Sequence, residues 1–80
     1  MQDYTFTVKA VWDPEAQVWV ADSDDVPGLA AEAETSEKLN EKLGSLIPEL
    51  LELNGVRPET EIEVIIHYYR EERISVPIAA

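Results

Sequence analysis

Apolar and polar residues alternate over residues 4–12, which is the pattern of a β-strand with one buried face. Residues 13–17 predict a turn, because Pro14 fixes φ and has no N–H to donate to a sheet. The strand pattern resumes at residues 18–21, so the two segments predict an antiparallel hairpin. The apolar side of the first strand is expected to consist of Tyr4, Phe6, Val8, Ala10 and Trp12.

A second turn is predicted at residues 24–28. The Pro-Gly pair at its end favours a turn with positive φ at the glycine, here Gly28. Residues 29–34 then predict a short third strand, which would extend the hairpin into an antiparallel meander.

Leucine and isoleucine recur at three- and four-residue intervals over residues 39–53, which is the spacing of an amphipathic helix. Thr35 is the expected N-cap, and Asn54-Gly55 is the expected end, where glycine can adopt the left-handed conformation. Pro48 interrupts the pattern. We expect one kinked helix rather than two, because the carbonyl that this proline crowds belongs to Gly44. The apolar stripe comprises Leu39, Leu43, Leu46, Ile47, Leu50, Leu51 and Leu53.

After a linker at residues 56–60, apolar residues alternate again over residues 62–68 and predict a further strand. Residues 70–73, Arg-Glu-Glu-Arg, are interpreted as a turn or bulge, and residues 74–78 as one more short strand. A three-stranded sheet cannot bury an apolar face by itself, and the leucine stripe is the expected cover. The sequence therefore predicts a single two-layer α+β domain over residues 1–80: a three-stranded antiparallel meander, one helix, then a further strand (β-β-β-α-β).

The chain has 80 residues, of which 17 are acidic and 6 basic, so its formal net charge is -11. Binding to DNA, RNA or an anionic membrane needs a surface rich in Lys and Arg, so none of these is an expected partner. The chain has no cysteine, which excludes disulfides and cysteine-based metal sites. It shows no run of signal-peptide or membrane-spanning character, so a cytoplasmic location is expected. Because so short a chain has a thin core, we also expect a homo-oligomer.

Acidic residues near the end of the second strand form the first candidate site. Carboxylates such as those of Asp22, Asp24 and Asp25 can hold Mg²⁺ or share acid and base roles. This segment lacks the glycine and closing glutamate of a calcium loop, which favours a solvated acidic rim. His67 is the only histidine, and no cysteine or serine motif accompanies it. We therefore expect neither catalysis nor a bound cofactor or metal.

The distribution of charge is the most informative feature of the sequence. No basic residue lies between Lys9 and Lys38, whereas eight acidic residues do, which favours either a cationic partner or simple solubility. Trp19 is interpreted as part of the core or, because tryptophan is enriched at binding hot spots, as an anchor for a partner. The expected partner-binding residues are Asp22, Asp24, Asp25, Glu32, Glu34 and Trp19.

The helix can cover only one side of a small sheet, which leaves apolar residues near the C-terminus for self-association. The expected oligomer interface comprises Ile65, Tyr69, Ile74 and Val76.

Several short motifs, in this order and spacing, resemble the HicB-like antitoxin superfamily. They are Val18-Trp19-Val20-Ala21, Asp25-Val26-Pro27-Gly28-Leu29 and Glu34-Thr35-Ser36-Glu37. Residues 13–15 and 46–51, with Asn54-Gly55, are similar to the small stand-alone branch of that superfamily, a domain of unknown function. The chain departs from the pattern at Ala33, where glycine is common, and at Leu29, where cysteine or serine is frequent.

The resemblance spans nearly the whole chain and implies a partial RNase H-like fold without the nuclease residues. It also implies a partner, because members of the superfamily pair with a small basic toxin that cleaves mRNA, and cover its catalytic face. The leading hypothesis is thus an antitoxin-type binding protein that neutralises such a toxin. The alternative is a self-associating structural or regulatory domain with no toxin. An RNase H-like, metal-dependent nuclease is the least favoured hypothesis.

Overall fold

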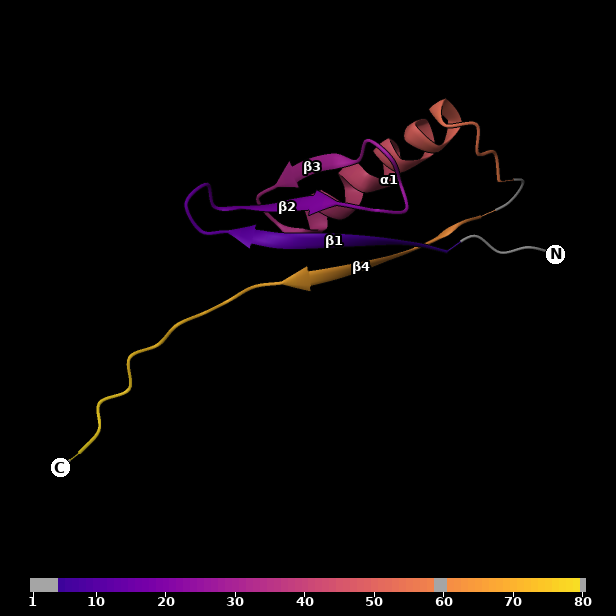
Figure 1. Cartoon of the computed structure of the whole chain (residues 1–80). Coiled ribbons are helices and arrows are strands. Elements are labelled where there is room, and N and C mark those ends of the chain that lie inside the picture. Colours follow the sequence, from indigo (N-terminus) through magenta and orange to yellow (C-terminus); the bar gives the residue numbers. More distant parts are fainter. Residues whose placement is uncertain (1–4, 59–60, 80) are drawn as a thin grey trace.

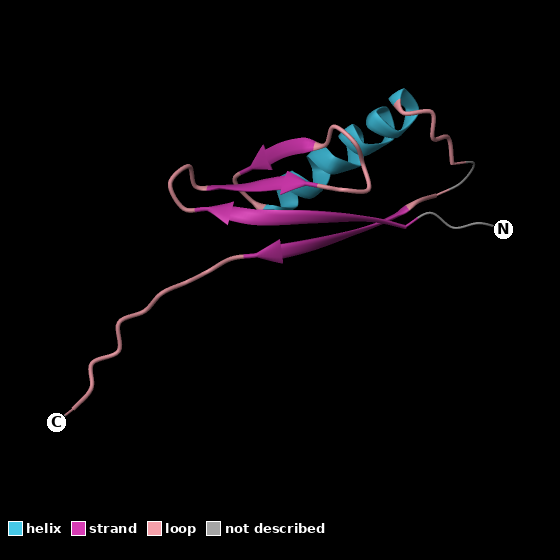
Figure 2. Ribbon diagram, in the orientation of Figure 1, coloured by secondary structure: helices cyan, strands magenta, loops and turns pink. Residues whose placement is uncertain are grey.

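The computed structural model describes residues 5–58 and 61–79, which form one helix packed on one face of a four-stranded sheet (Figures 1 and 2). The elements are β1 (Thr5–Asp13), β2 (Val18–Asp22), β3 (Ala30–Ala33), α1 (Ser36–Leu53) and β4 (Glu63–Tyr69). This arrangement confirms the predicted α+β class and the order β-β-β-α-β. Tyr4 and the end of the predicted 56–60 linker lie outside the described residues.

The sheet is mixed rather than a pure antiparallel meander. Its strand order is β3-β2-β1-β4, and the pairs β1–β2 and β2–β3 are antiparallel, as the sequence predicts. β4 joins the other edge of β1 in parallel, with Val8 opposite Ile66. The chain reaches β4 only after passing through α1, and such a crossover is the connection that parallel strands require. The longest strand, β1, is therefore central, and β3 and β4 form the two edges.

Local sequence signals set the turns and the helix ends. The Thr35 side chain accepts a hydrogen bond from the Lys38 N–H at 3.1 Å, which confirms Thr35 as the N-cap. The helix ends at Asn54 and Gly55, and Gly55 has a φ of 77°. Gly28, with a φ of 84°, has the positive φ predicted for the Pro-Gly turn. α1 is a single helix that contains Pro48, as predicted.

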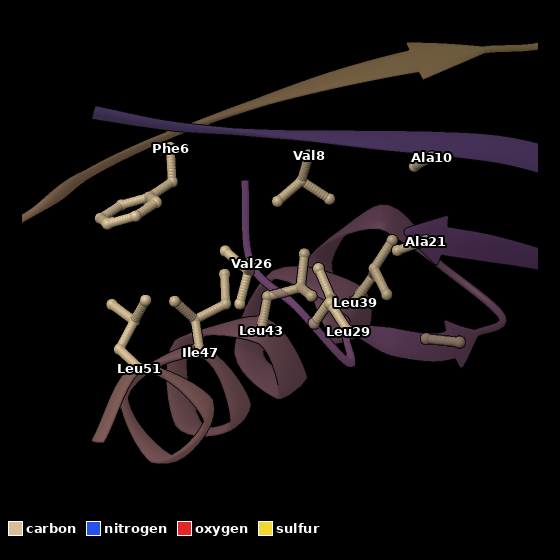
Figure 3. Packing of buried hydrophobic residues seen from close by; sticks show 11 residues of the cluster. Phe6, Val8, Ala10, Ala21, Val26, Leu29, Leu39, Leu43, Ile47 and Leu51 are labelled. Carbon is tan, nitrogen blue, oxygen red and sulfur yellow. The ribbon is translucent and has the colours of Figure 1, made fainter. Parts of the chain in front are cut away.

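The core lies between β1 and α1 (Figure 3). Phe6, Val8 and Ala10 point from β1 toward the helix and are buried, which confirms the predicted alternation. The buried helix residues, spaced four apart, are Leu39, Leu43, Ile47 and Leu51. The expectation for Leu53 is wrong, because its side chain is 82% exposed. Successive helix residues are rotated by about 100°, which places Leu53 about 100° away from the middle of the helix face formed by the four buried residues.

Residues 70–79 have no regular secondary structure and run away from the body of the protein (Figure 1). The turn or bulge predicted at residues 70–73 and the strand predicted at residues 74–78 are therefore wrong. The charged residues instead pair along an extended backbone, with Arg73 Nε 2.6 Å from Glu71 Oε2 and a longer pair between Arg70 and Glu72. This segment, called the C-terminal arm below, directly continues β4.

A candidate docking surface on the outer face of the sheet

The face of the sheet opposite α1, called the outer face below, is open and partly apolar. Val11 of β1 and Val20 of β2 lie directly opposite each other and are 43% and 41% exposed. Tyr69 pairs with Val11 from the other side, and Ile65 lies on the same face of β4. Sequence reasoning missed Val11 and Val20 as candidates. The available signal was an apolar residue at an outward position in each of two paired strands.

Three of the expected acidic residues lie together at one end of this face. Asp22, Asp24 and Asp25 line a shallow pocket of about 270 Å³ beside Thr7 and Lys9. The strand register places Lys9 directly opposite Asp22, so a basic residue lies within the acidic group. Sequence reasoning missed this neighbour, because Lys9 precedes the long stretch without bases and joins the group only through strand pairing.

The carboxylates of this group have different roles. The Asp25 Oδ2 accepts a hydrogen bond from the Thr7 backbone N–H at 2.7 Å, so Asp25 ties the loop to β1. The Ser23 hydroxyl reinforces the same loop, donating to the Thr7 carbonyl and accepting from the Asp25 N–H. Within residues 5–58 and 61–79, no hydrogen bond or ion pair uses the side chain of Asp22 or Asp24. These two carboxylates are therefore available to an external cation.

The other acidic candidates lie further along the edge of the sheet. Glu32 of β3 is paired with Val20 of β2, so it is a diagonal neighbour of Asp22 on the outer face. Glu34 follows the end of β3. Lys42 of α1 donates to the Glu32 backbone carbonyl at 2.6 Å, leaving the Glu32 carboxylate exposed. The acidic residues thus form a rim along β2 and β3 rather than one compact cluster.

Trp19 lies on the helix side of the sheet, away from this rim. It is half-buried, its ring meets that of Tyr68 edge-on at 4.9 Å, and it contacts Trp12 at 5.3 Å. The structure therefore does not bring Trp19 together with Asp22 and Glu32, because alternate residues of a strand face opposite sides. Of the two interpretations of Trp19, its position supports packing within the fold.

Tyr68 connects β4 to the start of α1. Its hydroxyl lies 2.7 Å from Asn40 Oδ1 and 3.3 Å from the Ser36 carbonyl oxygen. Partial burial raises the pKa of Tyr68 above its ordinary value, and the nearby Glu37 carboxylate raises it further. Both effects favour the neutral phenol, which is also the form that can donate a hydrogen bond to Asn40.

The raised pKa of Tyr68 predicts a specific loss of stability in alkali. The neutral phenol is favoured in the folded state, so its stabilising contribution is complete below the unfolded pKa of about 10. The contribution is lost as pH rises through the higher folded pKa. Urea unfolding of the protein and of Tyr68→Phe should therefore show a stability difference that shrinks above pH about 10. Parallel pH profiles for the two proteins would contradict this prediction.

The remaining candidate chemistry is sparse. His67 is exposed on the outer face of β4, where its ring stacks on Tyr69 with centroids 6.5 Å apart. Among the described residues, no three His, Asp or Glu side chains are placed to share a metal ion. The described part of the chain also contains no helix that is long and apolar enough to span a membrane.

The fold and this surface define a small two-layer α+β protein with one helix and a four-stranded mixed sheet. The chain belongs to the family described as domain of unknown function DUF1902, whose model matches residues 5–77. A similar solved structure is that of hypothetical protein TTHA1013 from the extremely thermophilic bacterium Thermus thermophilus. The two share 53% sequence identity and a TM-score of 0.76 over 88% of this chain and 99% of the other. The search of curated proteins gave no match.

Proposed function

We propose that this chain is a HicB-like, antitoxin-type binding protein that neutralises a small basic mRNA-cleaving toxin by covering it, and that it catalyses no reaction itself. The observation that carries the proposal is the outer face of the sheet. There, the exposed Val11–Val20 pair lies beside the carboxylates of Asp22 and Asp24, which pair with no other described residue. An apolar centre with a polar rim is the usual anatomy of a protein–protein interface.

The charge of the surface supports a basic partner. The whole chain carries -11, and the rim of Asp22, Asp24 and Glu32 concentrates negative charge along one side of the apolar centre. An RNA-cleaving protein must hold phosphates with Lys and Arg, so its active face is complementary to such a rim. Covering that face would exclude RNA. The resemblance of the Pro-Gly turn and the Thr35-capped helix to HicB-like antitoxins supports the same class of partner.

The size of the surface is also suitable. A standard complex buries about 800 Å² on each partner, and the chain exposes 6393 Å² in total. The proposed surface excludes Trp19, which lies on the helix side, and is centred on Val11 and Val20 instead. Docking would cover apolar area that the fold leaves open, and the acidic rim would mainly speed the encounter.

The experiment uses the product of the reading frame next to the gene for this chain, which the proposal expects to be a small basic protein. Association and dissociation rates are measured by surface plasmon resonance at several salt concentrations. We expect Asp22→Asn/Asp24→Asn to slow association about tenfold at low salt and to change dissociation little, because rim charges steer the encounter. Asp25 is left unchanged, since its carboxylate holds the loop to Thr7.

The matched control is Glu49→Gln/Glu52→Gln, which removes the same charge from exposed positions on α1. This variant should keep nearly the original association rate. Equal slowing in both double variants would mean that only net charge matters. A neighbouring basic protein that does not bind, or whose toxicity persists when this chain is co-expressed, would refute the antitoxin proposal.

A further inference from the structure

The C-terminal arm, residues 70–79, is extended (Figure 2), with four charged residues followed by a largely apolar part at residues 74–79 that the described part of its own chain leaves uncovered. Ile74, Val76 and Ile78 are 85%, 63% and 87% exposed. In the described structure, residues 74–79 form no hydrogen bond or ion pair with the body of the protein. Three apolar side chains at alternate positions on an extended backbone are the pattern of a strand that buries one face. That face is therefore available to another molecule.

A groove of complementary character lies between β4 and α1. Its volume is about 270 Å³. Gly44 is one of the helix residues that line the groove, and it has open space where a Cβ would lie. Val64 and Ile66 of β4 are consequently only half-buried, unlike Val8 of the neighbouring strand. The main apolar lining residues are Leu43, Ile47, Pro48, Ile62, Val64 and Ile66.

The groove lies next to a free sheet edge. Among the described strands, β4 pairs with β1 on one side only, so the backbone groups along its other side are unpaired within the sheet. An extended segment laid along this edge would add a fifth strand, and its side chains on the helix side would enter the groove. This mode of recognition supplies main-chain hydrogen bonds and side-chain pockets together.

The arm cannot readily reach the edge of β4 in its own chain. A return along the same strand needs a tight turn, and residues 70–73 contain no glycine, proline, asparagine or aspartate to form one. The arm instead leads away from the end of β4 at Tyr69 (Figure 1). A second copy, related by a two-fold axis near Arg70, could lay its own arm antiparallel along this β4 and receive the first arm in return.

We propose that this chain forms a dimer by arm exchange, in which residues 70–79 of each copy lie antiparallel along β4 of the other. In that register Ile74 lies beside the partner's Ile66, and Val76 lies beside the partner's Val64. Residues directly opposite each other in an antiparallel pair have their side chains on the same face of the sheet. Ile74 and Val76 of the arm therefore lie on the helix side, as Ile66 and Val64 do, and face the groove. The arm spans about 33 Å when extended, which is enough to follow the seven residues of β4.

The charge and shape of the chain are compatible with the arm of a second copy lying in the groove. Two copies that each carry -11 repel each other, but the part of the arm that would lie beside the groove, residues 74–79, carries no charged side chain. The radius of gyration is 16.5 Å, against about 11.6 Å for a compact domain of this length. The exposed surface of 6393 Å² exceeds that of a compact chain of this mass by about 1,500 Å². A standard interface buries about 800 Å² on each partner, so the excess surface is large enough to supply one.

The family match supports the arm as part of the domain. The DUF1902 model extends to residue 77 and so includes Ile74 and Val76. Dimerisation by arm exchange does not depend on the toxin-binding proposal, because the arm and groove face the helix side, whereas the docking surface is the outer face.

The test measures the mass of the full chain by sedimentation velocity at micromolar concentration. The unmodified protein should be a dimer. Gly44→Leu should be a folded monomer, because leucine fills the groove while replacing glycine by a better helix former. Ile74→Asp/Val76→Asp should also be a folded monomer, because the arm then carries charge into an apolar groove. Circular dichroism verifies that both variants retain the fold.

A mixing experiment separates arm exchange from other interfaces. Gly44→Leu has an intact arm and a blocked groove. Ile74→Asp/Val76→Asp has a disrupted arm and an open groove. Each should be monomeric alone, whereas a mixture of the two should form a heterodimer through one arm and one groove. The control is Ile65→Asp, on the outer face of the same strand, which should remain dimeric.

Two results would overturn the proposal. One is a monomeric unmodified protein at micromolar concentration, which would leave the arm for a different partner. The other is a dimer that survives both Gly44→Leu and the arm substitutions but is lost in Ile65→Asp. That result would place the interface on the outer face, with Ile65 and Tyr69, rather than in the groove.

Discussion

Replacing Leu39 by alanine is expected to lower the free energy of unfolding by about 3 kcal/mol, the largest effect expected for a single residue of this chain. Leu39 is completely buried between α1 and the sheet, next to the capped start of the helix. The substitution removes apolar contacts and leaves a cavity that the surrounding residues fill only in part. In a domain of this size the loss is a large part of the total stability. Urea unfolding followed by circular dichroism measures it.

Leu53→Ala is the matched control, because it makes the same chemical change on the same helix. Leu53 is 82% exposed, so its truncation should change the free energy of unfolding by less than about 0.5 kcal/mol. Similar losses in the two variants would mean that the last turn of α1 is buried in solution, by the body of the protein or by another copy.

Trp19→Ala is expected to destabilise the protein by about 2 kcal/mol, less than the full value for a completely buried tryptophan. Trp19 is half-buried and links the hairpin to β4 through edge-on contacts with Trp12 and Tyr68. Trp19→Phe should recover part of the loss, because a smaller ring can keep some of the packing. Urea unfolding followed by circular dichroism measures both variants, since this signal does not depend on tryptophan fluorescence.

This expectation changes how binding experiments on Trp19 are interpreted. Weaker partner binding by Trp19→Ala would be ambiguous, because the fold itself is weakened. An unchanged free energy of unfolding would refute the packing role and restore Trp19 as a candidate anchor for a partner. Val20, its exposed neighbour on the opposite face of β2, is the better position for testing the docking surface.

The elements that sequence analysis predicted correctly depend on local chemistry. The N-cap at Thr35, the positive φ at Gly28 and the helix end at Gly55 each follow from the residue at that position. The alternation in β1 and the spacing of buried leucines in α1 follow from the geometry of strand and helix. Such signals are contained in a few neighbouring residues, so a single sequence suffices to find them.

The features that sequence analysis missed depend on which distant segments of the chain pair with each other in the sheet. Nothing within Glu63–Tyr69 specifies pairing with β1 or a parallel direction, because that choice is made by the path through α1. Lys9 enters the acidic group only because β1 pairs with β2. For the same reason Trp19 and Asp22, close in sequence, lie on opposite faces.

The end of the chain was misjudged for a different reason. Four charged residues at positions 70–73 are typical of an exposed turn, but they lack the residues that a tight turn needs. The alternating Ile74, Val76 and Ile78 do have the pattern of a strand, yet the described part of their own chain gives them no neighbour. A pattern in one sequence cannot show whether the neighbouring strand belongs to the same molecule.

The parallel pairing of β1 with β4 has a consequence for synthesis on the ribosome. β1 is made before β2, β3 and α1, and its partner at Glu63–Tyr69 is made only after all three. The hairpin and α1 can assemble earlier, but one edge of the central strand stays open for several seconds at about 5–20 residues per second. During that interval the backbone N–H and C=O groups along this edge of β1 are unpaired, and such an edge is a template for association with other unfinished chains. Chains truncated before residue 63 should therefore aggregate during expression, whereas the whole chain closes the edge itself.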